Sequence, residues 1–520
     1  MSQDRVIVVG AGMGGLAAAV DLAAAGLDVT VVERADAPGG KMRRQFVDEA
    51  PIDAGPTVFT MRDVFEGLFA DAGARLEDHV QLHGADVLAR HAWDDAGHFD
   101  LHADLERTVE AVGDFFGAAD ARGFRRFAAD ARRTFALLEH SYIKAARPSP
   151  VGLARRIGFT RIRDLLDTRP LRTLWSTLGD YFPDPRLRQL FGRYATYVGS
   201  SPFRAPATLM LIAHVECDGV WTVEGGMHGI ARALAALAEA RGARFRYGTE
   251  VRRIETAGGR VAAVTVGPTG DDGDGERLPA DAVVVNADAA ALARGLLGPD
   301  VVRGGAAPPP RQRSLSAVTW TLRARPRRFP LSHHTVFFGP DYAREFADIL
   351  ERRRLPVRPT VYVCAQDRHA GAERDGEGTP ERLLCLVNAP ADGDLRSFPA
   401  EEVRACKEEM LWTLKTCGLE LDHDPERVIT TTPADFETAF PGSGGALYGR
   451  ASHGWTASFR RPGSRTRVPG LYLASGSAHP GAGVPMATVS GRLAARSLLE
   501  DRASTSRSAR TAISGGTSTP

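Results

Sequence analysis

Short apolar runs and helix-spaced segments alternate at the start of the chain. Residues 6–9 have the pattern of a buried strand, residues 16–25 that of an alanine-rich helix ending at Gly26, and residues 29–32 that of a second strand. The order strand, helix, strand predicts a βαβ unit with parallel strands.

The same alternation returns in two later segments. Residues 225–254 predict a glycine turn, an amphipathic helix and a strand, followed by a hairpin strand at residues 260–266, and residues 283–285 begin another buried strand. Residues 470–491 predict a buried strand, a glycine- and proline-rich turn, and a helix. We therefore expect an α/β fold whose main sheet is assembled from separate pieces of chain.

Glycines occupy the first turn of the βαβ unit. Gly10, Gly12 and Gly15 form G-x-G-x-x-G, in which the first glycine permits a tight turn, the second lets the backbone approach a pyrophosphate, and the third lets the helix pack on the strand. Glu33 ends the second strand about twenty residues later, where an acidic side chain accepts hydrogen bonds from a ribose. The segment predicts a dinucleotide site.

A second glycine turn follows Glu33. Gly39 and Gly40 stand beside Lys41 and Arg43, whose charges suit a pyrophosphate or ribityl chain. Residues 52–60 then contain the sequence Asp-Ala-Gly-Pro-Thr. Taken alone, that stretch is equally well a turn in which the fixed φ of Pro56 is useful.

Together these motifs carry a resemblance to a known family. E-x(5)-G-G-K from Glu33, D-x-G-P-T from Asp53 and H-P-G-x-G-V from His479 resemble the FAD-dependent phytoene and carotenoid desaturases, within the amine-oxidase-like flavoproteins. Residues 190–199, 219–235, 362–368 and 479–487 resemble one subgroup, the hydroxyneurosporene (methoxyneurosporene) desaturases, which are 1-hydroxycarotenoid 3,4-desaturases.

The resemblance implies FAD as cofactor and a specific organisation. A Rossmann-like FAD-binding domain is expected from residues 1–60, 223–300 and 464–500, an interleaved α+β substrate-binding domain from residues 301–463, and a helical lid that also completes the substrate domain from residues 61–222. The cofactor-binding residues that it implies are Gly10, Ala11, Gly12, Gly14, Gly15, Glu33, Arg34, Gly40, Lys41, Gly55, Pro56, Thr57, Val251, Asp288, Gly476, Ser477, Pro485 and Met486. Ser475 departs from the family, because most relatives carry glycine there.

The implied reaction removes two hydrogens across C3–C4 of an acyclic 1-hydroxycarotenoid, with oxygen or a membrane quinone as electron acceptor. The catalytic residues are unknown, since His479, His228, Asp53 and Glu224 are all unproven as a base, and no metal is expected. A phytoene desaturase or a carotene isomerase would have the same cofactor motifs. A non-enzymatic isoprenoid carrier of the same fold is disfavoured by the intact glycines, and an amine oxidase by the lack of a cysteine placed for flavin attachment or an aromatic amine cage.

Residues 144–182 suit a membrane surface. Seven arginines there are mixed with large apolar residues, a composition typical of a helix in a bilayer interface, although a helical cap with a solvated arginine face has the same composition. Under the resemblance the insoluble substrate comes from lipid, which favours peripheral attachment to the inner face of the cell membrane. The phenylalanines of residues 105–138 indicate core packing by default and, under the resemblance, the wall of a polyene tunnel.

Composition sets the remaining limits. The chain has 520 residues, a net charge of +1 and no stretch of eighteen apolar residues, so the sequence favours a globular protein without a membrane span or a nucleic-acid partner. Five scattered cysteines favour a reducing compartment, and the absence of a signal-peptide pattern agrees with a cytoplasmic location. The serine- and threonine-rich residues 501–520 are expected to be a disordered tail.

Overall fold

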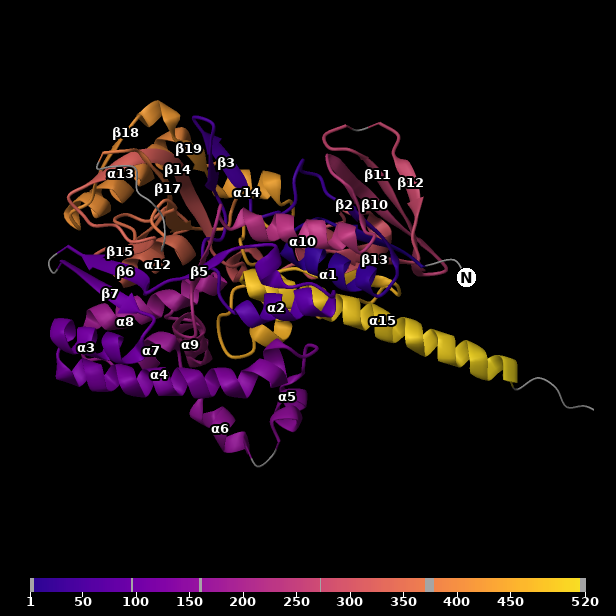
Figure 1. Cartoon of the computed structure of the whole chain (residues 1–520), viewed down its shortest axis with the longest axis horizontal. Coiled ribbons are helices and arrows are strands. Elements are labelled where there is room, and N and C mark those ends of the chain that lie inside the picture. The colour runs from indigo at the N-terminus through magenta and orange to yellow at the C-terminus, as the bar shows by residue number, and fades with distance from the viewer. Residues whose placement is uncertain (1–3, 95–96, 159–160, 272, 370–377, 515–520) are drawn as a thin grey trace, which may run out of the picture.

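The computed structural model describes residues 4–94, 97–158, 161–271, 273–369 and 378–514. Two lobes are visible in Figure 1, and the long helix α15 (Val484–Ser514) projects from one of them. Phe159, within the predicted membrane segment, and the last residues of the predicted tail lie outside the described residues.

Five parallel strands form the sheet of the first lobe, in the order β20-β13-β1-β2-β9. Val8 of the central strand lies opposite Val31 on one side and Val284 on the other. Both faces of the sheet are covered, which explains why its strands are continuous apolar runs. The strands are β1 (Arg5–Val9), β2 (Asp28–Val32), β9 (Arg244–Arg246), β13 (Ala282–Val285) and β20 (Leu471–Leu473).

Helices cover one face of this sheet and a small antiparallel sheet covers the other (Figure 1). The helices are α1 (Met13–Ala24), α10 (His228–Ala240) and the first half of α15. The antiparallel sheet consists of β10 (Thr249–Ala257), β11 (Arg260–Pro268) and β12 (Glu276–Pro279). The predicted α/β fold with a Rossmann-like nucleotide domain is thus confirmed.

The strand predicted at the end of residues 225–254 is in fact two strands. β9 joins the parallel sheet, with Phe245 opposite Val31, and β10 leaves it to pair with β11. Gly248 lies between them at a φ of 59°, a left-handed conformation that glycine adopts without strain. The strand-like sequence continues on both sides of Gly248, so the sequence predicted a single strand. The turn at Gly248 divides it into β9 and β10.

The second lobe is built on an eight-stranded mixed sheet. Its main path runs β18-β14-β17-β16-β15-β6-β7, and β19 pairs with β14. The strands are β6 (Val87–Trp93), β7 (Gly97–His102), β14 (Ser316–Arg327), β15 (His334–Phe337), β16 (Val361–Ala365), β17 (Glu381–Ala389), β18 (Glu420–His423) and β19 (Ile429–Thr431). Helix α13 (Ala400–Thr416) packs on it through Cys406, Met410 and Leu414.

Helices below this sheet in Figure 1 complete the second lobe. They are α3 (Leu105–Phe116), α4 (Ala118–Leu138), α5 (Pro150–Ile157), α6 (Ile162–Asp167), α7 (Leu174–Leu178), α8 (Pro185–Gly192) and α9 (Leu211–Cys217), with the short helical segments η2 (Glu139–Ile143), η4 (Arg193–Val198) and η5 (Ala207–Met210). Phe124 and Phe127 are buried against Phe182 and Phe191. The sequence allowed these phenylalanines to be either core residues or the wall of a polyene tunnel. Phe124 and Phe127 are core residues.

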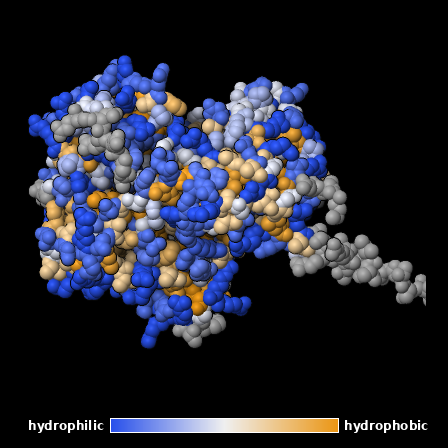
Figure 2. All heavy atoms as spheres, viewed as in Figure 1, coloured by the Kyte–Doolittle hydropathy of each residue, from blue (hydrophilic) through white to orange (hydrophobic). Residues whose placement is uncertain are grey.

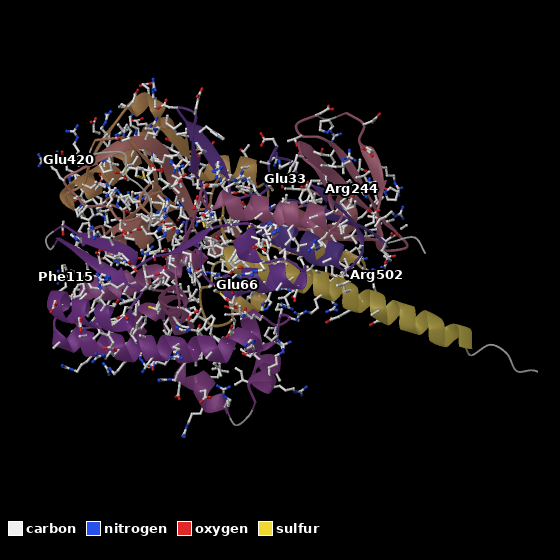
Figure 3. All side chains as sticks on the ribbon, viewed as in Figure 1. Glu33, Glu66, Phe115, Arg244, Glu420 and Arg502 are labelled. Atoms are coloured by element: carbon white, nitrogen blue, oxygen red, sulfur yellow. The ribbon has the colours of Figure 1, made fainter. Side chains whose placement is uncertain are left out.

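Shorter elements complete the two lobes. They are β3 (Arg44–Val47), β4 (Ala50–Asp53), α2 (Arg62–Asp71), η1 (Leu76–Asp78), β5 (Leu82–Gly84), β8 (Trp221–Val223), α11 (Ala289–Ala293), η6 (Pro299–Gly304), η7 (Pro310–Gln312), α12 (Tyr342–Leu350), η8 (Pro425–Arg427), α14 (Pro433–Ala439) and η9 (Ser458–Arg460). Figure 3 shows Glu33 and Arg244 on the nucleotide side of the molecule, with Phe115 and Glu420 on the other lobe.

The C-terminal tail differs from its prediction. Helix α15 continues through the serine- and threonine-rich stretch as far as Ser514, so the described part of residues 501–520 is helical rather than disordered. The helix is already formed where it packs on α1, and each added residue then extends it without a new nucleation step. Within the described residues, no helix combines the length and the apolar character that crossing a membrane requires.

Candidate active site

One cavity of about 1630 Å³ runs between the two lobes. Its walls come from the carboxyl ends of the parallel strands, the N-terminal ends of α1 and α15, the eight-stranded sheet, and the helices around α5 and α9. Single ligand pockets commonly enclose about 300–1,000 Å³. The cavity therefore has room for a dinucleotide and a second large ligand.

The two glycine turns form one end of the cavity. The backbone N–H of Gly39 donates to Ala11 O at 2.8 Å, and Gly12 and Gly39 form an isolated β-bridge. Glu33 Oε2 accepts from the Ala11 N–H at 2.6 Å, and burial raises the pKa of this carboxyl. The acidic side chain thus lies directly under the first glycine turn and borders the cavity.

The glycine turn leaves no space for side chains. A Cβ on Gly12 would lie 2.6 Å from Asn286 Oδ1, one on Gly14 2.7 Å from Ala474 O, and one on Gly15 2.0 Å from Gly10 O. The start of α1 is therefore packed directly on the neighbouring strand ends, which leaves its backbone open toward the cavity. Such a cradle fits the pyrophosphate of FAD.

Cationic side chains border the same region. Lys41 Nζ donates to Leu447 O at 2.7 Å, and burial lowers the pKa of its ammonium group. Arg461, which the sequence analysis missed, is buried and donates to the carbonyls of Tyr448, Arg450 and Gly476 at 2.7–3.0 Å. A single arginine in a loop carries no sequence signal of its own, and only the fold shows that it fastens the turn after β20.

The turn after β20 lines the cavity and is hydrogen-bonded to α11 and α15. Ser477 Oγ accepts from the Ala289 N–H at 2.9 Å and lies 2.7 Å from Ser475 Oγ. The unusual Ser475 therefore adds a hydrogen bond inside the turn, and its N–H donates to Ser490 Oγ at 3.2 Å. Pro485 and Met486 at the start of α15 line the cavity next to this turn.

Sixteen of the eighteen predicted cofactor residues line this one cavity. The two that do not are Ala11, which donates to Glu33, and Gly15, whose close contact with Gly10 O is the helix–strand packing expected for the third glycine. Arg34 and Val251 line the end near Glu33, and Gly55, Pro56 and Thr57 line the part near Lys41. Their contacts with the cofactor stay a prediction.

Each of the four candidate bases has at least one polar partner within the protein. His479 Nε2 lies 2.8 Å from Ala145 O and 3.0 Å from Tyr142 O, and His228 Nε2 lies 2.9 Å from Pro38 O, so both rings bind backbone carbonyls. Asp53 accepts from the Met227 N–H, and Glu224 pairs with His83. In the described part of the chain, however, Nδ1 of His228 and Nδ1 of His479 are buried without a hydrogen-bond partner, so the catalytic base stays unassigned.

The family follows from comparison with known sequences. The profile described as flavin containing amine oxidoreductase matches residues 13–499. The chain belongs to this family.

Curated relatives extend over nearly the whole chain. It is 53% identical to the hydroxyneurosporene desaturase of Rubrivivax gelatinosus, over 99% of this chain and 97% of the relative. It is 45% identical to the hydroxyneurosporene desaturase of Rhodobacter capsulatus (97% and 100%) and 33% identical to the phytoene dehydrogenase of Streptomyces griseus (96% and 96%). The resemblance to carotenoid desaturases is confirmed.

Solved structures support the fold. A putrescine oxidase variant matches with a TM-score of 0.60 at 17% identity, over 96% of this chain and 99% of that one. An oxidoreductase from Methanosarcina mazei matches with a TM-score of 0.56 at 18% identity, over 95% and 100%. With the family membership and the fit of the glycine cradle, FAD is the cofactor and the protein is a flavin-dependent oxidoreductase.

Proposed function

We propose that the protein desaturates an acyclic 1-hydroxycarotenoid such as 1-hydroxyneurosporene, by removing two hydrogens across C3–C4. The observation that carries the proposal is the 53% identity to a hydroxyneurosporene desaturase over 99% of this chain and 97% of the relative, against 33% to a phytoene dehydrogenase. Bound FAD supplies the oxidising capacity for this step. Oxygen or a membrane quinone then serves as the electron acceptor.

The chain's own residues position the substrate and exclude water. The second half of the cavity is apolar and continuous with the cofactor end, as a polyene requires. It is lined by Leu138, Ile143, Leu153, Leu165, Leu209, Leu211, Ile212 and Val215. Apolar burial along this wall, at about 25 cal/mol per Å², favours a long hydrocarbon ligand over a small polar amine.

Residues 144–182 supply the proposed contact with the inner face of the membrane. Leu166 and Leu171 are 64% and 77% exposed, yet both border the cavity, so exposed apolar side chains lie where the cavity comes close to the surface. Figure 2 shows hydrophobic surface on the lobe of α5 and α6, next to charged side chains. A carotenoid could pass from lipid into the cavity at this point without crossing water.

The arginines of this segment divide into two groups. Arg156 donates to the carbonyls of Ser141 and Ala146, while Arg169 and Arg172 pair with Asp180. Among the residues that the structure describes, no ion pair involves Arg155 or Arg163. These two are the arginines we assign to anionic lipid.

Turnover by the purified, FAD-loaded protein tests the proposed function. Phytoene, neurosporene and 1-hydroxyneurosporene are supplied separately, and the products are followed by their absorption spectra. We expect the hydroxylated substrate to gain one conjugated double bond at the highest kcat/KM. A preference for phytoene would establish the phytoene desaturase alternative, and a protein that binds carotenoid without changing any spectrum would establish the isoprenoid carrier.

A further inference from the structure

A buried polar cluster interrupts the apolar wall of the cavity. Arg193 of η4 is 9% exposed and Glu216 of α9 is 3% exposed, and Tyr197 lies between them. The Arg193 guanidinium donates to Tyr197 Oη at 3.1 Å, and Tyr197 Oη donates to Glu216 Oε1. All three residues line the cavity.

A second polar chain borders the same cavity on the cofactor side. Tyr362 Oη of β16 lies 2.6 Å from Thr57 Oγ1 and 2.7 Å from His334 Nδ1. Thr57 belongs to the Gly-Pro-Thr turn among the predicted cofactor residues. Arg193 and Tyr197 lie close enough to Tyr362 to influence its pKa, and burial raises the pKa of both tyrosines, so both stay neutral hydroxyls.

A hydrocarbon ligand gives no reason for such a cluster. Removing an arginine and a glutamate from water costs several kcal/mol per ion, and apolar residues of similar volume stabilise a protein as well or better. In the part of the chain that the structure describes, Arg193 Nε is buried and has no hydrogen-bond partner. Arg193, Tyr197 and Glu216 nevertheless line the cavity, so the cluster places charged and hydroxyl groups beside the ligand, which points to a polar group on that ligand.

Two of the four sequence stretches that resemble the 1-hydroxycarotenoid desaturases supply three of these residues. Arg193 and Tyr197 lie within residues 190–199, and Tyr362 begins residues 362–368. In a 1-hydroxycarotenoid the hydroxyl at C1 is two carbon–carbon bonds from C3. A group that holds this hydroxyl must therefore adjoin the place where C3–C4 reacts, and Tyr362, which lines the same cavity as the cluster, is hydrogen-bonded to Thr57 of the predicted cofactor turn.

We propose that Arg193, Tyr197, Glu216 and Tyr362 bind the C1 hydroxyl of the substrate and thereby select hydroxylated over unhydroxylated carotenoids. This inference rests on the proposed function. The hydroxyl accepts from Arg193 or a tyrosine and donates to Glu216, and the polyene extends from there along the leucine-lined wall. The four side chains are specificity-determining residues and take no proton in the reaction.

Tyr197→Phe and Tyr362→Phe test the inference, because each removes one oxygen and leaves the ring in place. Both variants are loaded with FAD, and kcat/KM is measured for 1-hydroxyneurosporene and neurosporene. We expect the ratio of the two values to fall about tenfold in each variant, mainly through loss with the hydroxylated substrate, since a site built to bond a hydroxyl discriminates strongly against its absence.

Tyr194→Phe is the matched control. Tyr194 donates to the other oxygen of Glu216, Oε2, but does not line the cavity. The Tyr194→Phe substitution therefore removes an equivalent buried hydrogen bond to the same carboxylate. We expect the ratio of kcat/KM for the two substrates to stay at the wild-type value even if the melting temperature falls. Substrate Kd values from tryptophan fluorescence quenching give a readout that does not depend on turnover.

The outcomes separate the inference from the function on which it rests. If wild-type protein prefers 1-hydroxyneurosporene but both tyrosine variants keep that preference, or if Tyr194→Phe loses it equally, the polar cluster is structural and the inference is wrong. If the FAD-loaded wild-type protein does not turn over the hydroxylated carotenoid, the proposed function itself fails and the inference falls with it. Should Tyr197→Phe fail to fold, Tyr362→Phe and Glu216→Gln decide the question by the same ratio.

Discussion

At Gly12 of the cofactor cradle, space rather than backbone conformation excludes a side chain. Gly12 has a φ of −74°, which any residue adopts, but a Cβ there would lie 2.6 Å from Asn286 Oδ1. The Asn286 amide is itself held by Ala474 O. The neighbour therefore cannot move away without disturbing the end of β20.

Replacement of Gly12 by alanine tests this crowding. We expect Gly12→Ala to purify with less than about half the wild-type flavin content, measured from the flavin absorbance per protein, because Asn286 must leave the cradle. Gly229→Ala is the control. Its Cβ would make only ordinary contact, 3.7 Å from Val223 Cγ1, so it should keep its flavin and gain up to about 1 kcal/mol of helix stability. Equal flavin loss in both variants would contradict the prediction.

A buried histidine makes the stability of the protein depend on pH. His479 is 1% exposed, and burial lowers its pKa to about 4. In the unfolded chain the imidazole has its ordinary pKa near 6.5. Between these values the unfolded state binds a proton that the folded state does not, so this contribution is complete above about pH 6.5 and is lost as the pH falls toward 4.

His479→Gln should weaken this pH dependence, because the glutamine amide can still donate to Ala145 O but does not titrate. We expect the free energy of unfolding of the wild-type protein to fall between about pH 6.5 and about pH 4, by up to about 3 kcal/mol more than in the variant. Urea titrations at several pH values measure the difference. Parallel pH profiles for the two proteins would show that His479 does not contribute.

At the scale of elements, the contact between α1 and α15 fixes the geometry of the cofactor site. A Cβ on Gly491 would lie 2.1 Å from Gly14 O, so the two helices approach each other backbone to backbone. The N-terminal ends of both helices line the cavity. Their separation therefore determines how the first glycine turn and the turn after β20 face the same cofactor.

Gly491→Ala should force the two helices apart. We expect a loss of about 1–3 kcal/mol of unfolding free energy together with weaker FAD binding, measured by urea denaturation and by flavin titration of the apoprotein. Arg496→Ala, on an exposed position of the same helix, is the control and should change stability by less than about 0.5 kcal/mol. A Gly491→Ala protein with unchanged stability and affinity would show that the helices can separate without cost.

At the scale of the whole molecule, one cavity between the two lobes is lined by three different regions of the structure. The parallel sheet presents the cofactor cradle, the helical lobe supplies the apolar wall, and the exposed Leu166 and Leu171 border the cavity in and just after α6. A substrate held in lipid meets these leucines first and the cradle last. Under the proposed membrane contact, the same cavity therefore connects the lipid surface to the cofactor site.

Substitution of both exposed leucines tests the membrane contact. We expect Leu166→Ser with Leu171→Ser to bind anionic liposomes about tenfold more weakly in co-sedimentation, since two apolar side chains no longer enter the interface. Leu395→Ser is the control, because Leu395 is 60% exposed and does not line the cavity. Undiminished binding by the double variant would remove these leucines from the membrane contact.

The sequence by itself determined the local parts of this protein. The glycines of the first turn, Glu33 and the H-P-G-x-G-V stretch predict a βαβ unit, FAD and the family, because each depends on backbone geometry that neighbouring residues specify. Tertiary structure alone decided what distant residues do together. The sequence around Arg193 and Tyr362 does not indicate that these side chains are buried or which residues they contact. The role of Arg461 depends on three backbone carbonyls that lie next to it only in the folded chain. Burial and long-range contact are properties of the packed chain, and so the polar cluster in the cavity emerged only from the fold.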